Sequence, residues 1–208
     1  MKKFMDKKEH IIDAAIELFA EKGFEGTSIR DLAAKADVNV AMINYYFGSK
    51  EKLFECILKQ KAAYTRDILE EIVNNDALTD IEKLDKIIDN YVLRLFCNRK
   101  FHRVIHHELM LNEREIIHDA IVNILFPNGL LIRGVVEAGI KKGVFKKVDS
   151  LLVLATIVGT INQVLLSKKF CNKQLNKEDD YIPYEDPKFR KRVSDHLKEL
   201  IHSYLLKD

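Results

Sequence analysis

Apolar residues recur at helical spacing along the whole chain, and this feature constrains the fold more than any other. In the first segment Ile11, Ala15 and Leu18 follow one another at intervals of three or four, which places them on one face of a helix. Gly and Pro are scarce, with 8 and 3 among 208 residues, so architectures rich in strands and tight turns are disfavoured. The sequence therefore predicts an all-α fold of about nine helices.

Two short helices are expected to meet at a tight turn near the N-terminus. Gly23 ends the first, longer helix, and Thr27 or Ser28 begins a second one. Asp37 follows, and Asp is among the few non-glycine residues that tolerate the left-handed conformation of a tight turn. A further short helix is expected from about residue 39 to residue 47. A supporting helix followed by two short helices is typical of helix-turn-helix DNA recognition.

The second short helix carries a small, polar outer face. Helical spacing turns Ile43 and Phe47 inward, and Asn44 then faces outward, where its amide can bind adenine. Hydroxyl groups, backbone N–H groups at helix starts and the ammonium of Lys50 are suited to phosphate contacts. The candidate DNA-binding residues are Thr27, Ser28, Arg30, Asn39, Val40, Ala41, Met42, Asn44, Tyr45, Tyr46 and Lys50.

Charge alone does not argue for DNA binding. The first 55 residues hold eight Lys and one Arg against ten Asp and Glu, a net charge of −1, and the whole chain carries +2. A purely structural interpretation also stands, in which Met42 and Tyr46 pack against the first helix and Arg30 pairs with a nearby acid. The matching functional alternative is a protein-interaction module that uses the motif only for packing.

Several short segments near the N-terminus form a specific pattern, because they fix many residues at rigid spacing. They are Ala14-Ala15, Leu18-Phe19, Gly23-Phe24, Thr27 to Ala33, Ala36, Val38 and Tyr45 to Leu53. With them, residues 11–54 resemble the DNA-binding domain of the TetR family of bacterial transcriptional repressors. Asp37 departs from the usual Gly, and Asn44 from the usual Tyr, as in a subgroup with the sequence Asn-Tyr-Tyr/His-Phe-Gly-Ser-Lys.

The resemblance implies a helix-turn-helix domain at residues 1–55 and a larger helical domain at residues 56–208 that binds an effector and dimerises. It implies a ligand-responsive repressor that binds palindromic operator DNA as a homodimer, and neither catalysis nor a cofactor is expected. By position, the residues that match phosphate contacts are Thr27, Tyr45, Tyr46 and Lys50, and those that match the recognition helix near bases are Asn39, Ala41, Met42 and Asn44.

Capping and breaking residues predict the helices of the larger domain. Thr79 begins one with a capping box, and Pro127 is expected to end another that starts at Glu113, because Pro disfavours helix at the preceding residue. Residues 129–142 are expected to form the next helix. The polar segment 173–185 is expected to be a mobile loop.

Two apolar helices predict dimerisation. Residues 149–170 are apolar on nearly all sides, and residues 187–206 carry a broad apolar stripe. One small domain does not bury both without exposing a patch, so we expect them to pair with a second copy across a two-fold axis. The longest apolar stretch, Leu151 to Leu166, is shorter than the ~18 residues of a membrane span, so no membrane partner is expected.

A small-molecule pocket between helices is the preferred interpretation of the larger domain. Its candidate residues are Tyr91, Leu95, Phe96, Ile105, His106, Met110, Ile121, Leu125, Phe126 and Asn162. The same residues suit a solid core, because periodicity does not separate a pocket from packing. Both interpretations stay open on the sequence alone.

A metal enzyme or metal sensor is the competing hypothesis. His102 and His106 are four residues apart in the predicted helix 101–111, a spacing that can bind a metal, with Glu108 or His118 nearby. The simpler interpretation is a polar helix face that pairs with neighbouring helices. Three widely spaced cysteines and a first segment without the apolar run of a signal peptide favour the cytoplasm.

Overall fold

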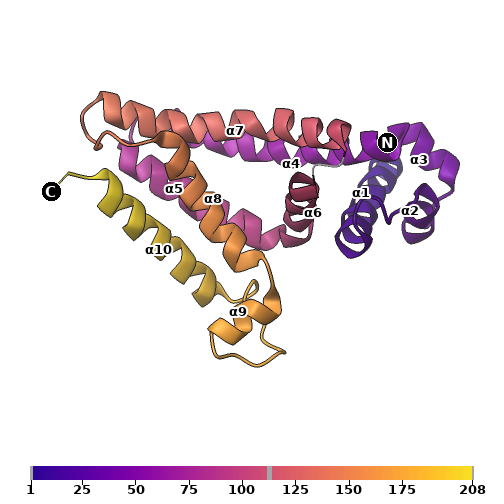
Figure 1. Ribbon diagram of the computed structural model, residues 1–208. Helices are drawn as coiled ribbons and strands as arrows, with labels where there is room; N and C mark the ends of the chain where they lie inside the picture. The colour runs from indigo at the N-terminus through magenta and orange to yellow at the C-terminus, as the bar shows by residue number, and fades with distance from the viewer. Residues whose placement is uncertain (1, 112–113, 208) are drawn as a thin grey trace. The chain divides into compact units, whose positions relative to one another are not determined.

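The protein is helical throughout the residues that its computed structural model describes, 2–111 and 114–207 (Figure 1). The helices are α1 (Lys2–Lys22), α2 (Ile29–Lys35), α3 (Val40–Phe47), α4 (Lys50–Val73), α5 (Asp80–Cys97), α6 (Arg99–Leu111), α7 (Glu115–Lys141), α8 (Ser150–Leu165), α9 (Lys168–Gln174) and α10 (Pro187–Leu205). Within these ranges the extended pairing is limited to one isolated bridge between Phe145 and Leu206. The all-α prediction is confirmed.

The chain divides into two compact units. One takes in the chain up to Tyr64 together with Lys100–Phe126, and the other holds Thr65–Arg99 and the chain from Pro127 onward. Helices α4 and α7 each contribute residues to both units. This division by packing differs from the boundary expected at residue 55, which remains a prediction about functional domains.

The core of the first unit is built around three aromatic rings. Phe19, Phe24 and Phe54 lie 5.3 to 5.8 Å apart, measured between ring centroids, and all three are buried. Phe101 of α6 adds a ring 6.5 Å from Phe54. The guanidinium of Arg103, also on α6, donates to the Ala20 carbonyl at 2.5 Å. Helix α6 therefore packs with α1 and α4, and belongs to the first unit.

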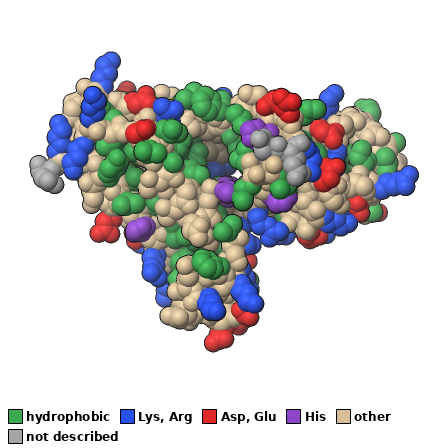
Figure 2. All heavy atoms as spheres, in the orientation of Figure 1, with side chains coloured by type: hydrophobic (Ala, Val, Ile, Leu, Met, Phe, Trp, Pro, Cys, Tyr) green, Lys and Arg blue, Asp and Glu red, His purple; other side chains and the backbone are tan. Residues whose placement is uncertain are grey.

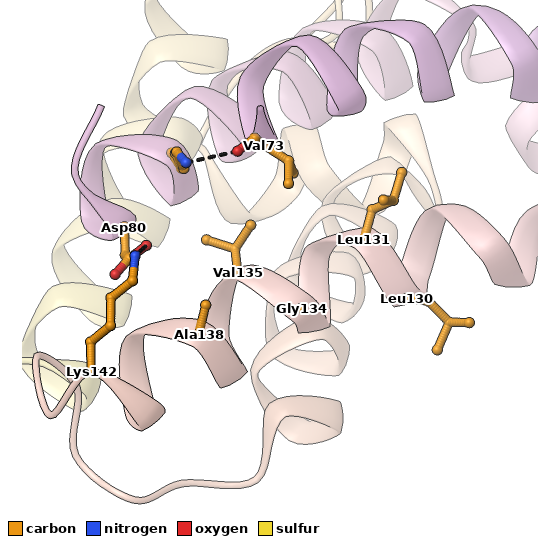
Figure 3. A pocket seen from close by; sticks show the side chains of 9 residues that line it. Val73, Asp80, Leu130, Leu131, Gly134, Val135, Ala138 and Lys142 are labelled. Atoms are coloured by element: carbon orange, nitrogen blue, oxygen red, sulfur yellow. Dashed lines mark hydrogen bonds and ion pairs between the residues drawn. The ribbon is translucent and has the colours of Figure 1, made fainter. Parts of the chain in front are cut away.

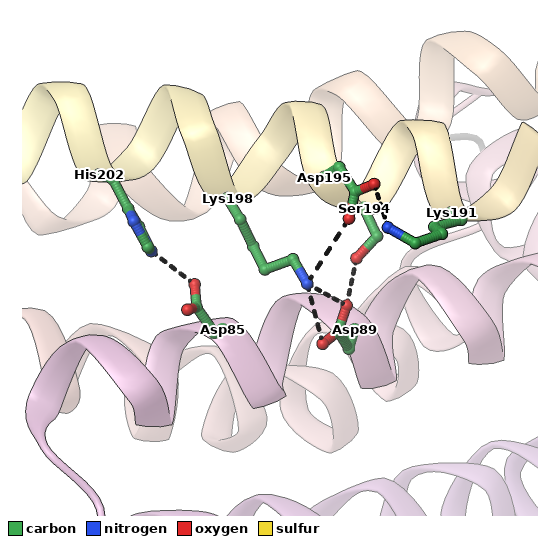
Figure 4. A network of polar contacts seen from close by, with 7 residues as sticks. All are labelled: Asp85, Asp89, Lys191, Ser194, Asp195, Lys198 and His202. Atoms are coloured by element: carbon green, nitrogen blue, oxygen red, sulfur yellow. Dashed lines mark hydrogen bonds and ion pairs between the residues drawn. The ribbon is translucent and has the colours of Figure 1, made fainter.

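In the second unit α5, α8 and α10 lie side by side (Figure 1) and bury a common apolar core. Polar contacts join α10 to α5 (Figure 4). Asp89 accepts hydrogen bonds from Ser194 and from Lys198, the latter at 3.0 Å, and His202 Nε2 lies 2.7 Å from Asp85 Oδ1. These contacts fix the rotation of α10 about its own axis.

The prediction that Pro127 ends a helix is wrong. Helix α7 continues through Pro127 from Glu115 to Lys141, and residue 113, the predicted start, lies outside the described residues. An internal Pro removes one backbone hydrogen bond and costs about 3 kcal/mol. Buried residues on both sides, such as Ile121 and Ile132, anchor α7 in the two cores, and this packing outweighs the local preference.

The prediction of one helix over residues 149–170 is also wrong, because α8 ends at Leu165. Ser167 then caps the separate helix α9, its hydroxyl accepting from Phe170 N–H at 3.3 Å. The segment after α9 is a loop, as expected, but side-chain hydrogen bonds hold it against α9. The buried Asn172 side chain donates to the carbonyls of Glu178 and Tyr181, both at 2.8 Å.

By length and composition alone, α7 could cross a bilayer, and so could α8 with α9 if that bent pair were one span. Such a pattern also fits core helices. Ile117, Ile132 and Val136 of α7 are buried within the protein, as are Val153 and Ile157 of α8.

Candidate nucleic-acid interface

Capping and a left-handed turn position helices α2 and α3. The Ser28 hydroxyl accepts from Asp31 N–H at 3.1 Å, and the Asp31 carboxylate accepts from Ser28 N–H at 2.9 Å. Hydrogen bonds from Ser28, with Lys22 at 3.0 Å, hold the pKa of Asp31 well below its usual range. Asp37 has φ 48°, and Val38 N–H bonds back to the Ala33 carbonyl at 3.0 Å. The predicted conformation of Asp37 is confirmed.

Helix α3 divides cleanly into a buried and an exposed face. Ile43 is fully buried and Phe47 nearly so, which anchors the helix in the first core. The exposed face consists of Val40, Ala41, Asn44 and Tyr45, and Tyr45 is 81% exposed. Asn39 caps the helix, with its side-chain oxygen accepting from Met42 N–H at 2.8 Å. Asn39 therefore positions α3, and the exposed face lies free for a partner.

Lys50 and Thr27 are engaged inside the first unit. The Lys50 ammonium donates to the carbonyls of Phe24 and Thr27 at 2.9 and 3.0 Å, and lies 4.4 Å from the centre of the Phe24 ring. Thr27 is fully buried, and its hydroxyl donates to the Gly23 carbonyl at 2.8 Å. Both residues hold the turn between α1 and α2, a role that the sequence did not reveal.

The remaining candidates for DNA contact divide between surface and core. Ser28 and Arg30 are exposed, and within the described residues Arg30 forms no ion pair. Met42 and Tyr46 are half-buried, and the Tyr46 hydroxyl is enclosed with no hydrogen-bond partner among the described atoms. Tyr46 packs against the first core, so its hydroxyl points away from the solvent face.

The sequence reasoning did not predict an ion-pair cluster in the first unit, which Arg114 forms with Glu25 and Glu108. Arg114 Nε lies 2.9 Å from Glu25, its Nη1 lies 2.6 Å from Glu108, and its guanidinium lies 5.7 Å from the Phe24 ring centre. Arg114 thus joins the loop before α7 to α6 and to the turn after α1. Glu25 is far from Arg114 in sequence, and Glu108 lies six residues before it, at a spacing that no helical pattern pairs.

The metal hypothesis is not supported. The described residues contain no group of three or more His, Cys, Asp or Glu side chains arranged to hold a metal ion. Glu108 is 4% exposed and paired with Arg114. The rings of His102 and His106 are 6.1 Å apart between centroids and meet edge to face. Both histidines are half-buried, and the histidine next to the Glu108 carboxylate is His107, at 3.4 Å.

The predicted ligand-binding residues are distributed over both units. Tyr91, Leu95 and Asn162 are half-buried in the second unit, where burial raises the pKa of Tyr91 to about 12 despite the opposing charge of Arg94. The others are Phe96, Ile105 and Ile121, which are buried; His106 and Leu125, which are half-buried; and Met110 and Phe126, which are exposed. None of the ten lines the groove of about 370 Å³ that lies between the end of α4, the start of α5 and the middle of α7 (Figure 3), and their assignment remains a prediction.

An exposed α3, set on α2 and on a longer supporting helix, defines a helix-turn-helix protein of the DNA-binding class. The family model described as "Bacterial regulatory proteins, tetR family" matches residues 11–57. "Fatty acid metabolism regulator protein" of Bacillus subtilis is 30% identical over 171 residues, which cover 79% of this chain and 84% of that protein. "Probable HTH-type transcriptional regulator YttP" of the same organism is 26% identical over 197 residues, 94% of this chain and 92% of the relative.

A solved structure of a related regulator has a similar fold. The transcriptional regulator FadR from Bacillus subtilis, in complex with stearoyl-CoA, superposes with a TM-score of 0.72 at 26% identity and covers 93% of this chain and 96% of its own. The chain belongs to the TetR family and is a transcriptional regulator of that family.

Proposed function

We propose that the protein is a repressor that binds a palindromic operator as a homodimer and responds to a small molecule. The observation that carries the proposal is the exposed face of α3, whose Val40, Ala41 and Asn44 offer small and amide side chains to base edges. Tyr45 extends from the same face and has a hydroxyl suited to a phosphate. Buried Ile43 holds this face in place.

Dimerisation is supported by exposed apolar residues on α8 and α10. Leu151, Leu152 and Leu166 are 53 to 57% exposed on or beside α8, and Leu200 is 40% exposed on α10. Figure 2 displays hydrophobic side chains over the part of the second unit that contains α8 and α9. A monomer gains nothing from apolar surface of this kind, whereas a two-fold partner would bury it.

A small-molecule effector would act by binding one arrangement of the dimer better than another. Only the arrangement that spaces the two recognition helices one DNA turn apart fits successive major grooves. The solved relative that contains stearoyl-CoA supports the proposal of a small-molecule effector. Operator binding places the protein in the cytoplasm, and the proposal assigns it no catalytic activity.

The proposal is tested with DNA from upstream of the protein's own gene. Affinity is expected to fall steeply as salt rises, because phosphate contacts release counterions. We expect Asn44→Ala to reduce discrimination against scrambled DNA by about tenfold, and Tyr45→Phe to weaken binding to both DNAs. Glu70→Gln, at an exposed position of α4, serves as the matched control. Salt-independent binding, or wild-type behaviour of both α3 variants, would contradict the proposed interface.

A further inference from the structure

The exposed cations of the first unit fall into two groups. One group is engaged by carboxylates or by a backbone carbonyl of the protein, and its members are Lys22, Lys35, Lys59, Lys100 and Arg103. Among the described side chains of this unit, the exposed cations that form no ion pair or hydrogen bond are Lys7, Lys8, Arg30 and Lys52. Two of these belong to α1, and the other two belong to α2 and α4, the helices that precede and follow α3.

Lys8 lies beside the end of α3. Its Nζ is 5.8 Å from the centre of the Phe47 ring, and Phe47 is the last residue of that helix. Asn44, on the exposed face of α3, is three residues earlier, or about 4.5 Å along the helix axis at 1.5 Å per residue. Phe47 is 7% exposed, whereas Lys8 is exposed. The Lys8 ammonium therefore lies within about one helical turn of the proposed base-reading face and is open to solvent.

The sequence of α1 leaves the charge of Lys8 without a counterion. On a helix surface, the neighbours of a residue are those three and four positions away. At these positions from Lys8 stand residues without charge, and they are Phe4, Met5, Ile11 and Ile12. Glu9 is turned about 100° away around the helix. Lys8 therefore offers a full positive charge next to α3.

We propose that Lys8 binds a phosphate group of the DNA backbone at the edge of the major groove that α3 enters. An ammonium donates charge-assisted hydrogen bonds to phosphate, and such contacts orient a protein on the duplex without reading its sequence. Lys8 precedes residues 11–57, which the family model matches, so this contact lies outside the matched motif. The inference rests on the proposed function, because it requires α3 to bind DNA.

The test measures the affinity of the full chain for DNA by fluorescence anisotropy at several salt concentrations. The probes are the duplex from upstream of the protein's own gene and a scrambled duplex of the same length. Lys8→Met keeps the aliphatic stem and is expected to bind both duplexes at least about fivefold more weakly than wild type. The slope of log affinity against log salt should become shallower by about 0.9 for each lost phosphate contact, or about 1.8 for a dimer.

Two further variants separate a phosphate contact from the effects of charge and of folding. Lys8→Arg keeps the charge and is expected to keep the wild-type salt slope. Lys59→Met removes an equal charge from an exposed position of α4 and should leave affinity and slope unchanged.

A wild-type salt slope in Lys8→Met would overturn the proposal even if its affinity falls, because a side chain that only supports the fold releases no counterions. An equal change of slope in Lys59→Met would also overturn it. In both cases operator binding by the wild-type protein stands. Absence of salt-dependent binding by the wild-type protein itself would instead contradict the proposed function, and this inference would fall with it.

Discussion

At the scale of single residues, the sequence predicts that Lys50 contacts DNA, whereas in the structure its side chain stabilises the turn between α1 and α2. The sequence motif correctly indicates where Lys50 lies, in the first turn of the helix after the recognition helix. It does not indicate that two carbonyls and the Phe24 ring surround the ammonium. Those partners lie 23 and 26 residues away, and only the folded chain brings them to Lys50.

Replacing Lys50 with Met is therefore expected to lower the stability of the first unit as well as DNA affinity. Losing the hydrogen bonds to both carbonyls should reduce the free energy of unfolding by about 2 kcal/mol, although the Phe24 carbonyl still accepts from Thr27 N–H at 3.3 Å. Urea denaturation of Lys50→Met measures this change. Lys52→Met, at an exposed position two residues on, is the control. Unchanged stability with lost DNA affinity would show that Lys50 serves phosphate contact alone.

The hydrogen bonds between Ser28 and Asp31 at the start of α2 make the stability of the first unit depend on pH. The pKa of Asp31 is lowered by folding, so its contribution is present above the unfolded pKa of about 3.9 and is lost as pH falls toward the folded value. Wild type is expected to exceed Asp31→Asn in unfolding free energy at pH 7, with the gap narrowing below about pH 4. Urea denaturation at several pH values measures it, with Asp13→Asn as an exposed control. A gap independent of pH would contradict the assignment.

At the scale of whole helices, the sequence predicted a helix boundary correctly where local residues determine it and wrongly where tertiary packing does. The caps of α2 and α5 follow from local residue types: Ser28, one of the two expected residues, caps α2, and Thr79 caps α5 as expected. The course of α7 through Pro127 does not follow from local preference, because buried residues on both sides set it. The break after Leu165 likewise depends on the packing of α9.

Two glycines in α7 are expected to respond in opposite ways to substitution by Ala. A Cβ at Gly139 would lie 2.1 Å from the ring of Phe145, which is 2% exposed and has little room to move. Gly139→Ala should therefore destabilise the protein by about 1–3 kcal/mol. Gly134→Ala meets no neighbour and should stabilise it by about 1 kcal/mol. Thermal and urea unfolding measure both, and equal effects would contradict the packing of Phe145 against α7.

At the scale of the whole molecule, each unit has its own apolar core, and the proposed functions divide between them. The first unit presents the exposed face of α3, and the second holds the groove between α4, α5 and α7 and the exposed residues of α8 and α10. The exposed face of α3 that we propose for DNA binding could be predicted from the sequence because a dense motif fixes its position. Sequence reasoning did not predict the groove, because helical periodicity does not reveal which apolar positions remain uncovered.

Charge on the exposed surface of α8 is expected to separate the homodimer. Leu152→Glu would place two unpaired carboxylates in a symmetric interface, so the dissociation constant should rise at least about 100-fold, about 2.7 kcal/mol. Sedimentation equilibrium measures this change, and operator affinity should fall with it. Ile116→Glu, at a 75% exposed position of α7, is the control and should remain dimeric. A fully dimeric Leu152→Glu protein would contradict the proposed interface.

The most direct test of operator recognition through α3 is selection of genomic DNA fragments by the purified protein at two salt concentrations. We predict that the recovered fragments share an inverted repeat with half-sites about one helical turn apart. The repeat should remain enriched at the higher salt and disappear when Asn44→Ala and Tyr45→Ala are combined. Recovery of the same fragments by that double variant, or no enrichment by the wild-type protein, would contradict the account.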